Sequence, residues 1–368
     1  MNPYSLSSYL RGGALFLNNA LRPRHKRLGS LMIYATSRCQ SRCQHCSIWQ
    51  KPHEDLTLTE IAAIVRSRCV TPHTVVGLEG GEFILHPEAD AILAWFDAHH
   101  PCYTLLTNGL ASDRVSDAVA RHRPTRLYVS LDGPRDTYCR MRGRDGYDAV
   151  LRTVRACRDR VPVSLMFCLS PWNSFDDLRH VIHVARDEGA DVRIGIYGTL
   201  AFFDTHAGLL AAEPDRFAGE IPDEVLQTQE NFDYLALYGE WRNGTLRLPC
   251  RSICSQLVVH SNGNVPLCQN LDTVLGNIRE QPLDAIFNSA AACAAQRRYG
   301  RGCNGCWINY HRKYDIILHR TLERWMPRRA VAALLGDYQW SARPGETYRQ
   351  FLARHARRDA RPADEPLP

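Results

Sequence analysis

Three cysteines, Cys39, Cys43 and Cys46, lie within eight residues of one another and directly follow a short apolar run. Thiolates at this spacing can surround one soft metal centre, and four-iron clusters are usually held by four of them. Three ligands would leave one iron open, and an open position is typical of a catalytic metal site. The alternative is a structural zinc site that takes its fourth ligand from His45 or His53.

Five further cysteines are grouped in the C-terminal part of the chain. They are Cys250, Cys254, Cys268, Cys303 and Cys306. Their Cys-x3-Cys and Cys-x2-Cys pairs are compatible with an iron–sulfur cluster and also with a four-cysteine zinc ribbon. Most of the other cysteines are expected to be small buried residues, but Cys139 and Cys168 lie close to the ends of predicted strands and are candidates for facing an active site.

Composition limits the class of protein. The chain has 14 cysteines among 368 residues, and its first 30 residues lack a signal-peptide pattern. Disulfides are rare in the reducing cytosol, so we expect a cytoplasmic protein whose cysteines bind metal or take part in redox chemistry. The net charge of +6 is too small to indicate a nucleic-acid partner. No run of about 18 or more apolar residues is present, so we expect no membrane partner.

The elements that must position these cysteines form a repeated pattern between residues 31 and 198. Six apolar runs read as strands, and they span residues 31–36, 74–82, 103–109, 126–133, 162–170 and 191–198. Amphipathic stretches between them read as helices, at residues 56–70, 89–100, 112–122, 146–160 and 174–190. This alternation predicts an α/β fold, a partial (β/α)6 barrel of the TIM type, in which chemistry takes place at the C-terminal ends of the strands.

The rest of the chain is less regular. Residues 199–245 are interpreted as a sixth helix with a long connection, residues 255–270 as a β-hairpin that turns at Asn262-Gly263, residues 283–298 as a helix, and residues 314–340 as basic amphipathic helix. The last twelve residues are interpreted as a frayed tail. We therefore divide the chain into a basic lead-in (1–30), a barrel (31–235), a small hairpin-and-helix domain (236–312) and a basic helical extension (313–368).

The Cys-x3-Cys-x2-Cys motif after the first strand resembles that of the radical S-adenosylmethionine (SAM) superfamily. Other segments follow in the order that this family shows: Gly80-Gly81-Glu82 after the second strand, Asn108 after the third, Ser130-Leu131-Asp132-Gly133 after the fourth, then Arg142, and Ser170 and Asn173 after the fifth. The resemblance implies that His45, Gly80, Gly81, Glu82, Asn108, Ser130, Asp132, Arg142, Ser170 and Asn173 bind SAM. Phe83 stands where the family usually has proline, which changes the turn but leaves Glu82 in place.

The resemblance also implies the cofactors. Cys39, Cys43 and Cys46 would hold a [4Fe–4S] cluster that cleaves SAM to a 5′-deoxyadenosyl radical. The second cysteine group resembles SPASM and twitch domains, which hold auxiliary [4Fe–4S] clusters. Cys250, Cys268, Cys303 and Cys306 fit one twitch spacing, although Cys254 could replace Cys250. No cysteine follows Cys306, and Arg312 stands where a later one could fall, so we expect a single auxiliary cluster.

Several functions remain open within this resemblance. The first is oxidation or epimerisation of a natural-product intermediate, an amino-sugar-like small molecule, with Cys254 or Cys139 as a catalytic thiol. Acidic residues that could attract an amine lie in the irregular region, at Asp204, Glu213, Asp215 and Glu220. The alternative is a maturase that crosslinks or epimerises a ribosomally made peptide. Either would need an electron donor such as flavodoxin or ferredoxin. A distant alternative is a zinc-binding scaffold protein.

Overall fold

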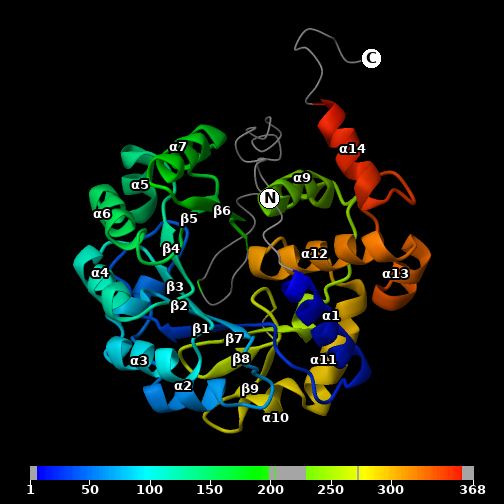
Figure 1. The fold of residues 1–368 in the computed structure, drawn as a ribbon, viewed down its shortest axis with the longest axis horizontal. Helices are drawn as coiled ribbons and strands as arrows, with labels where there is room; N and C mark the ends of the chain where they lie inside the picture. Colours follow the sequence, from blue (N-terminus) through cyan, green and yellow to red (C-terminus); the bar gives the residue numbers. More distant parts are fainter. Residues whose placement is uncertain (1–5, 199–202, 204–228, 272, 359–368) are drawn as a thin grey trace.

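A curved parallel sheet forms the centre of the molecule in this computed structural model, which describes residues 6–198, 203, 229–271 and 273–358. Its seven strands lie in the order β6-β5-β4-β3-β2-β1-β7 (Figure 1). They are β1 (Ser30–Thr36), β2 (Val75–Gly80), β3 (Tyr103–Thr107), β4 (Arg126–Ser130), β5 (Val163–Leu169), β6 (Asp191–Ile196) and β7 (Gln256–Val259). The first six strands confirm the predicted α/β partial barrel.

Helices connect these strands and cover the convex face of the sheet (Figure 1). They are α2 (Leu58–Val65), α3 (Ala89–His99), α4 (Ser112–Arg121), α5 (Arg135–Arg142), α6 (Tyr147–Cys157) and α7 (Phe175–Asp187). Each strand turns alternate apolar side chains toward the helices, so that Ile33, Leu78, Leu105, Val129 and Leu165 are fully buried in one core. α5 was not predicted, because five of its eight residues are charged or polar.

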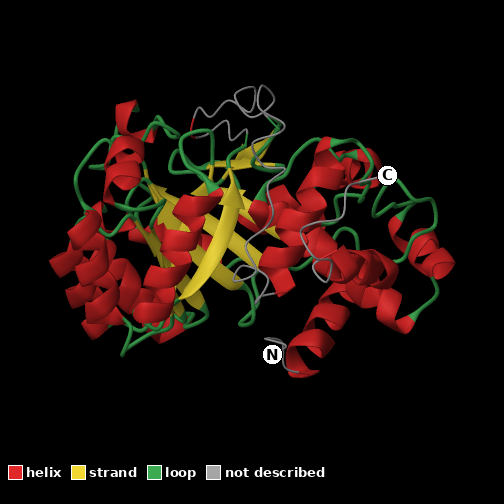
Figure 2. Cartoon of the chain, turned by 90° about the horizontal axis from the view of Figure 1, so that it is seen from above, coloured by secondary structure: helices red, strands yellow, loops and turns green. Residues whose placement is uncertain are grey.

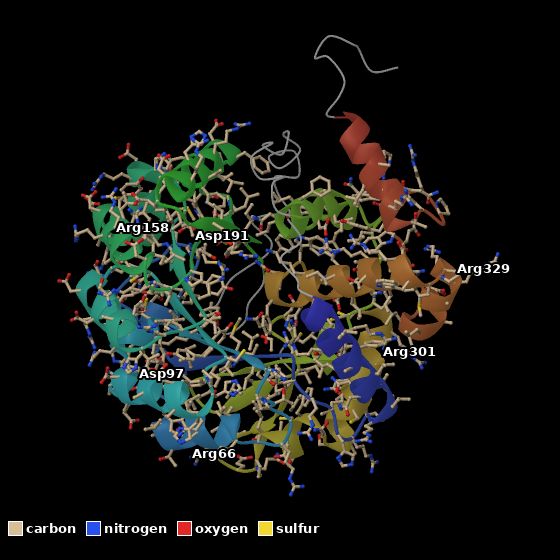
Figure 3. All side chains as sticks on the ribbon, in the orientation of Figure 1. Arg66, Asp97, Arg158, Asp191, Arg301 and Arg329 are labelled. Atoms are coloured by element: carbon tan, nitrogen blue, oxygen red, sulfur yellow. The ribbon has the colours of Figure 1, made fainter. Side chains whose placement is uncertain are left out.

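Most of the N-terminal and C-terminal helices lie on the other side of the sheet, whereas α10 lies near the residues that follow α2 (Figure 1). They are α1 (Leu6–Leu21), α9 (Gln229–Arg242), α10 (Leu283–Phe287), α11 (Ala290–Gly302), α12 (Asn309–Trp325), α13 (Arg328–Leu335) and α14 (Tyr348–Arg358). Figure 2 shows the strands in the middle of the molecule with helices on both sides. Charged side chains such as Arg158, Arg301 and Arg329 point outward from the periphery (Figure 3). Within the described residues, no helix combines the length and the apolar character that a membrane crossing requires.

The predicted hairpin over residues 255–270 is wrong in its strand pairing. The turn exists, because Gly263 has φ of +84° and its N–H donates to the His260 carbonyl at 2.9 Å. However, β7 pairs in parallel with β1, while β8 (Asn264–Pro266) pairs in antiparallel fashion with β9 (Val274–Asn277). All four side chains of β7 are buried, which is the signature of a strand inside a parallel sheet and not of a solvated hairpin.

Three other segments differ from the expected ones. The lead-in contains the helix α1, the predicted helix over 283–298 is divided at Asn288, and the basic helix over 314–340 is interrupted at Pro327, which cannot continue a helix. The expected boundary at 235/236 falls inside α9, and the one at 312/313 falls inside α12. Most of the expected frayed tail lies outside the described residues.

The C-terminal extension is attached to the molecule by a buried polar cluster. Arg320 and the Tyr348 hydroxyl both donate to the carboxylate of Asp233 on α9. The Glu323 carboxylate accepts from the Trp340 indole at 3.0 Å and from the Tyr348 N–H at 2.7 Å. The extension therefore packs as part of the folded unit.

We expect Trp340→Ala to lower the free energy of unfolding by about 3–5 kcal/mol, because a fully buried tryptophan leaves a large cavity. Urea denaturation followed by far-UV circular dichroism measures this change. Trp325→Ala is the matched control, since Trp325 is 83% exposed and its removal should change stability by less than about 0.5 kcal/mol. Equal effects of the two substitutions would show that the extension is not part of the cooperative unit.

Candidate functional site

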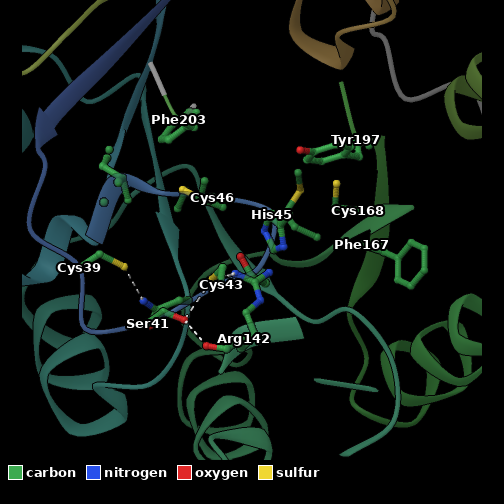
Figure 4. Close-up of a pocket in the computed structure, with 18 of the residues that line it drawn as sticks. Cys39, Ser41, Cys43, His45, Cys46, Arg142, Phe167, Cys168, Tyr197 and Phe203 are labelled. Atoms are coloured by element: carbon green, nitrogen blue, oxygen red, sulfur yellow. Dashed lines mark hydrogen bonds between the residues drawn. The ribbon is translucent and has the colours of Figure 1, made fainter. Parts of the chain in front are cut away.

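The C-terminal ends of the strands border a cavity of about 310 Å³. Cys39, Cys43 and Cys46 line it from the loop after β1. Figure 4 shows their three side chains on one side of His45, with Cys168 and Tyr197 on the other side. The structure thus brings the first predicted cysteine group together in a single cavity.

The cysteine loop is held by backbone contacts with the end of α5. The N–H of Arg42 donates to the Arg142 carbonyl at 3.0 Å, and the N–H of Gln44 donates to the Met141 carbonyl at 2.9 Å. Gly143 ends α5 with φ of +64°, and a Cβ there would lie 2.6 Å from the Arg42 carbonyl oxygen. Only glycine therefore permits this approach.

The three thiols have surroundings that fit an iron–sulfur cluster. Asn108 Nδ2 lies 3.7 Å from the Cys39 sulfur, and Arg142 Nη1 lies 3.7 Å from the Cys43 sulfur. Such donors stabilise negative charge on cluster sulfurs. Burial raises the pKa of Cys39 to about 11 and that of Cys46 to about 12, so these thiols become thiolates only when a metal replaces the proton.

The glycine pair after β2 lies against the same loop. The N–H of Gly81 donates to the Thr36 carbonyl at 2.8 Å, and the N–H of Glu82 donates to the Arg38 carbonyl at 2.7 Å. A Cβ on Gly81 would lie 2.2 Å from the Arg38 carbonyl oxygen. Gly80 and Gly81 both line the cavity, so they leave bare backbone for a ligand to approach.

Glu82 lies behind the cavity wall rather than in it. Its carboxylate accepts from the Thr107 hydroxyl at 2.9 Å and from the Asn108 N–H at 2.7 Å. The side chain is 1% exposed, and this burial raises the pKa of Glu82 to about 7. In this conformation Glu82 fixes the end of β3, and Asn108 is the residue that reaches the cavity.

The other predicted SAM-binding residues divide in the same way. Ser130, Arg142 and His45 line the cavity. His45 Nδ1 is buried and has no hydrogen-bond partner within the described residues, and burial lowers the pKa of His45 to about 4. A neutral imidazole with an unmet polar atom fits a ligand that supplies a hydrogen bond.

Asp132, Ser170 and Asn173 form a buried support beneath the cavity. Asn173 Nδ2 donates to the Cys168 carbonyl at 2.9 Å and to the Asp132 carbonyl at 3.2 Å. The Ser170 N–H donates to Asn173 Oδ1 at 2.8 Å. The Asp132 carboxylate accepts from Arg142 Nε at 2.6 Å. These residues orient their neighbours, and the structure does not place them on the cavity surface.

A second pocket collects four of the five C-terminal cysteines. Its lining includes Cys250, Cys268, Cys303 and Cys306, together with apolar side chains and His311. Cys254 instead lines a separate pocket with Phe16 and Asn19 of α1. The short 3₁₀ turn Ser252–Cys254 between Cys250 and Cys254 accounts for their different directions.

The two predicted catalytic thiols do not line the central cavity. Cys254 lies in the pocket beside α1, and Cys139 lies on α5 beside Asp145. Cys168 on β5 does line the cavity. Its place near the end of a predicted strand was the reason for naming it as a candidate. Tyr197, Ile308 and Asn309 line it as well. Nothing local in the sequence marked Ile308 and Asn309, because they reach the barrel from the C-terminal domain. Asp204, Glu213, Asp215 and Glu220 lie outside the described residues.

Comparisons with protein families agree with this geometry. Residues 33–185 match the model of the radical SAM superfamily, and residues 250–307 match that of the SPASM iron–sulfur cluster-binding domain. The first match covers the cavity cysteines and the ends of β2, β3, β4 and β5. No curated protein sequence matches the chain significantly.

Solved structures share the fold at low sequence identity. SuiB from Streptococcus suis is 15% identical, with a TM-score of 0.59 over 81% of this chain and 75% of that one. SuiB bound to its precursor peptide SuiA is 13% identical, with a TM-score of 0.56 over 80% and 73%. The protein anSMEcpe with bound AdoMet and the Cp18Cys peptide is 14% identical, with a TM-score of 0.53 over 90% and 98%.

These matches settle the cofactors together with the family. A radical SAM domain uses SAM and a [4Fe–4S] cluster, and a SPASM domain binds further iron–sulfur cofactor. The zinc-scaffold alternative has no counterpart among them. The chain belongs to the radical SAM superfamily and carries a C-terminal SPASM iron–sulfur cluster-binding domain.

Proposed function

We propose that this radical SAM enzyme takes a hydrogen atom from an apolar or aromatic residue of a peptide and oxidises that residue. The observation that carries the proposal is the chemistry of the cavity wall opposite the cysteine loop. Met166, Ile196, Tyr197 and Ile308 line that wall, whereas Phe203 lines the cavity beside the cysteine loop, where its carbonyl accepts from the Ser47 N–H at 3.0 Å. Apolar side chains there would bind an apolar group by burial and would exclude water from a radical.

The residues of the barrel would hold its cofactors at the opposite wall. Cys39, Cys43 and Cys46 would hold the cluster, and the bare backbone of Gly80 and Gly81 would leave room for SAM in the same cavity. The bound cluster and SAM together supply the 5′-deoxyadenosyl radical. Arg142 donates toward the Cys43 sulfur, and its pairing with Asp132 keeps the guanidinium in that position. A small electron-transfer protein, flavodoxin or ferredoxin, is the proposed reductant.

Cys250, Cys268, Cys303 and Cys306 would hold a single auxiliary cluster, with Cys254 as the spare thiol. The shared pocket of these four side chains supports this assignment. The bound auxiliary cluster supplies an electron acceptor for a substrate radical. Arg312 is 1% exposed and lies where another ligand could follow, but its guanidinium donates to the Leu248 carbonyl at 3.1 Å.

Iron content tests the ligand assignment. Anaerobically reconstituted protein should hold about eight irons, since each cluster holds about four. Cys303→Ala should reduce this number to about four and leave SAM cleavage intact, and Cys43→Ala should abolish SAM cleavage. Cys254→Ala is the matched control and should keep about eight irons. Loss of the auxiliary signal in electron paramagnetic resonance (EPR) on Cys254→Ala would contradict the choice of Cys250.

Two observations favour a peptide over an amino sugar. A sugar carries hydroxyl groups that need hydrogen-bond partners when buried, and the described wall opposite the cysteines offers few. The structures of similar fold include SuiB bound to its precursor peptide and anSMEcpe bound to a peptide. The earlier expectation of an amino-sugar-like substrate stays a prediction that this wall does not favour.

A panel of probes tests the substrate class. Pentapeptides with a central tryptophan, tyrosine, leucine or lysine, and glucosamine, are each added to reduced enzyme with SAM, and 5′-deoxyadenosine is measured by mass spectrometry. The aromatic and leucine peptides should stimulate its formation at least about five-fold over the lysine peptide and glucosamine, because their side chains match the apolar wall. Greater stimulation by glucosamine would overturn the proposal.

Cys168 favours epimerisation as a second candidate reaction. It lines the cavity beside Tyr197 and is not among the proposed cluster ligands. Burial raises the pKa of Cys168 to about 12, so the side chain stays a thiol that can return a hydrogen atom to a substrate carbon. In this reaction the 5′-deoxyadenosyl radical takes one hydrogen atom and the thiol gives one back from another face. The thiyl radical left on Cys168 then takes one electron from the proposed reductant and one proton to become a thiol again.

Solvent deuterium separates the two reactions. In D2O the Cys168 thiol exchanges, so epimerisation would place one deuterium in the modified peptide, and Cys168→Ala would lose that product. Oxidation would lower the peptide mass by two hydrogens without uptake of deuterium, and Cys168→Ala would keep this mass change. Mass spectrometry of the peptide panel reads both outcomes. Cys157→Ala is the control, because this buried thiol lies on α6 away from the cavity.

A further inference from the structure

A four-residue segment connects the two cysteine sites. Cys306 lines the auxiliary pocket, whereas Ile308 and Asn309 line the central cavity. Asn309 Nδ2 donates to the Ile194 carbonyl of β6 at 2.8 Å, which attaches the far end of the segment to the barrel. The position of residues 306–309 therefore determines how far the auxiliary pocket lies from the cavity.

Tyr234 of α9 forms two hydrogen bonds with Trp307, in the middle of this segment. Its hydroxyl donates to the Trp307 carbonyl, and the Trp307 indole donates back to the Tyr234 carbonyl at 3.1 Å. The two rings stack with centroids 5.4 Å apart and an interplanar angle of 22°. Tyr234 is fully buried, so these reciprocal bonds form away from water, where a hydrogen bond is stronger.

The contacts of Tyr234 with Trp307 place it beside the segment that joins the two sites. The pKa of its phenol lies well above the usual value, first because of burial and then because of the Cys168 and Cys306 sulfurs. Cys168 lines the cavity, and Cys306 lines the auxiliary pocket. One phenol therefore lies within electrostatic reach of a thiol from each site.

Two other aromatic residues, Trp241 and Tyr238, pack against the indole ring of Trp307. Trp241 and Tyr238 lie with ring centroids 5.6 and 6.1 Å from Trp307, and Arg312 lies over the ring at 5.7 Å. The Tyr238 hydroxyl accepts from Arg242 at 3.2 Å. Tyr238 packs against the same indole, and the described bond of its hydroxyl is to Arg242 within α9. It is therefore a matched comparison for Tyr234.

We propose that Tyr234 is a positioning residue that fixes the auxiliary cluster site relative to the substrate cavity by clamping residues 306–309 between α9 and β6. The proposal rests on the proposed function, in which Cys306 is an auxiliary ligand. Tyr234 contacts neither cluster nor substrate in it. The Tyr234 hydroxyl and the Trp307 indole each donate to a backbone carbonyl of the other residue. These bonds would keep the distance between the auxiliary site and the cavity constant.

The test removes the hydroxyl and keeps the ring. Tyr234→Phe and Tyr238→Phe are reconstituted anaerobically as full chains, and iron is counted. The readout is microwave power saturation of the EPR signal with both clusters reduced, which depends on the separation of two paramagnetic centres and needs no substrate. Tyr234→Phe should keep its iron and change the half-saturation power at least about three-fold, whereas Tyr238→Phe should stay within about 1.5-fold of the wild type.

A second variant tests the same contact from its other side, in case Tyr234→Phe fails to fold. Trp307→Phe removes the reciprocal indole bond and should change the half-saturation power in the same direction as Tyr234→Phe. Unchanged saturation in both variants would overturn the proposal, and so would loss of auxiliary iron in both, since the pair would then build the site rather than position it. Failure of the proposed function is seen separately, as iron content that Cys303→Ala leaves unchanged.

Discussion

The buried ion pair between Asp132 and Arg142 joins most of the catalytic parts of the barrel. Arg142 Nε lies 2.6 Å from the Asp132 carboxylate, which is completely buried. The other oxygen of Asp132 accepts from the Cys168 N–H of β5 at 3.3 Å. The carbonyl of Arg142 accepts from the cysteine loop, and its guanidinium points at Cys43. If Asp132 or Arg142 were buried without the other, the unpaired charge would strongly destabilise the fold. β4, β5, α5 and the cysteine loop must therefore assemble together.

In this arrangement the buried carboxylates at the strand ends do not line the cavity themselves, but orient the residues that do. Glu82 and Asp132 are buried behind the cavity, where they hold Asn108 and Arg142, and these second residues reach the surface. On the side of the cysteine loop the cavity thus has bare backbone and oriented donors, beside the apolar side chains of Ile48 and Trp49. Apolar side chains form the other wall.

Local patterns in the sequence were enough to predict the barrel, because alternation of strands and helices leaves few topologies and the turns at strand ends are short. They were also enough to place Cys39, Cys43 and Cys46 together. The pairing of β7 was not predicted, since the Asn262-Gly263 turn indicates only that the chain reverses and not which strand the first arm pairs with. The direction of Cys254 was likewise hidden, because spacing alone does not distinguish a 3₁₀ turn from a helix or a loop. Ile308 and Asn309 required the tertiary structure.

The place of β7 in the sheet has a consequence for how such proteins can be recombined. Its backbone pairs with Ser30–Ile33 of β1, so the first piece of the SPASM-matching region to form a strand belongs physically to the barrel. A chimera that joined another module directly after the residues of the radical SAM match would remove β7 from its place beside β1. The outer edge of β1 would then expose unpaired N–H and C=O groups. A cut after β7, in the turn around Gly263, would keep this pairing but would leave Cys250 on the barrel side, apart from the other three proposed ligands. In this chain the borders of modules defined by sequence and those defined by hydrogen bonding do not coincide.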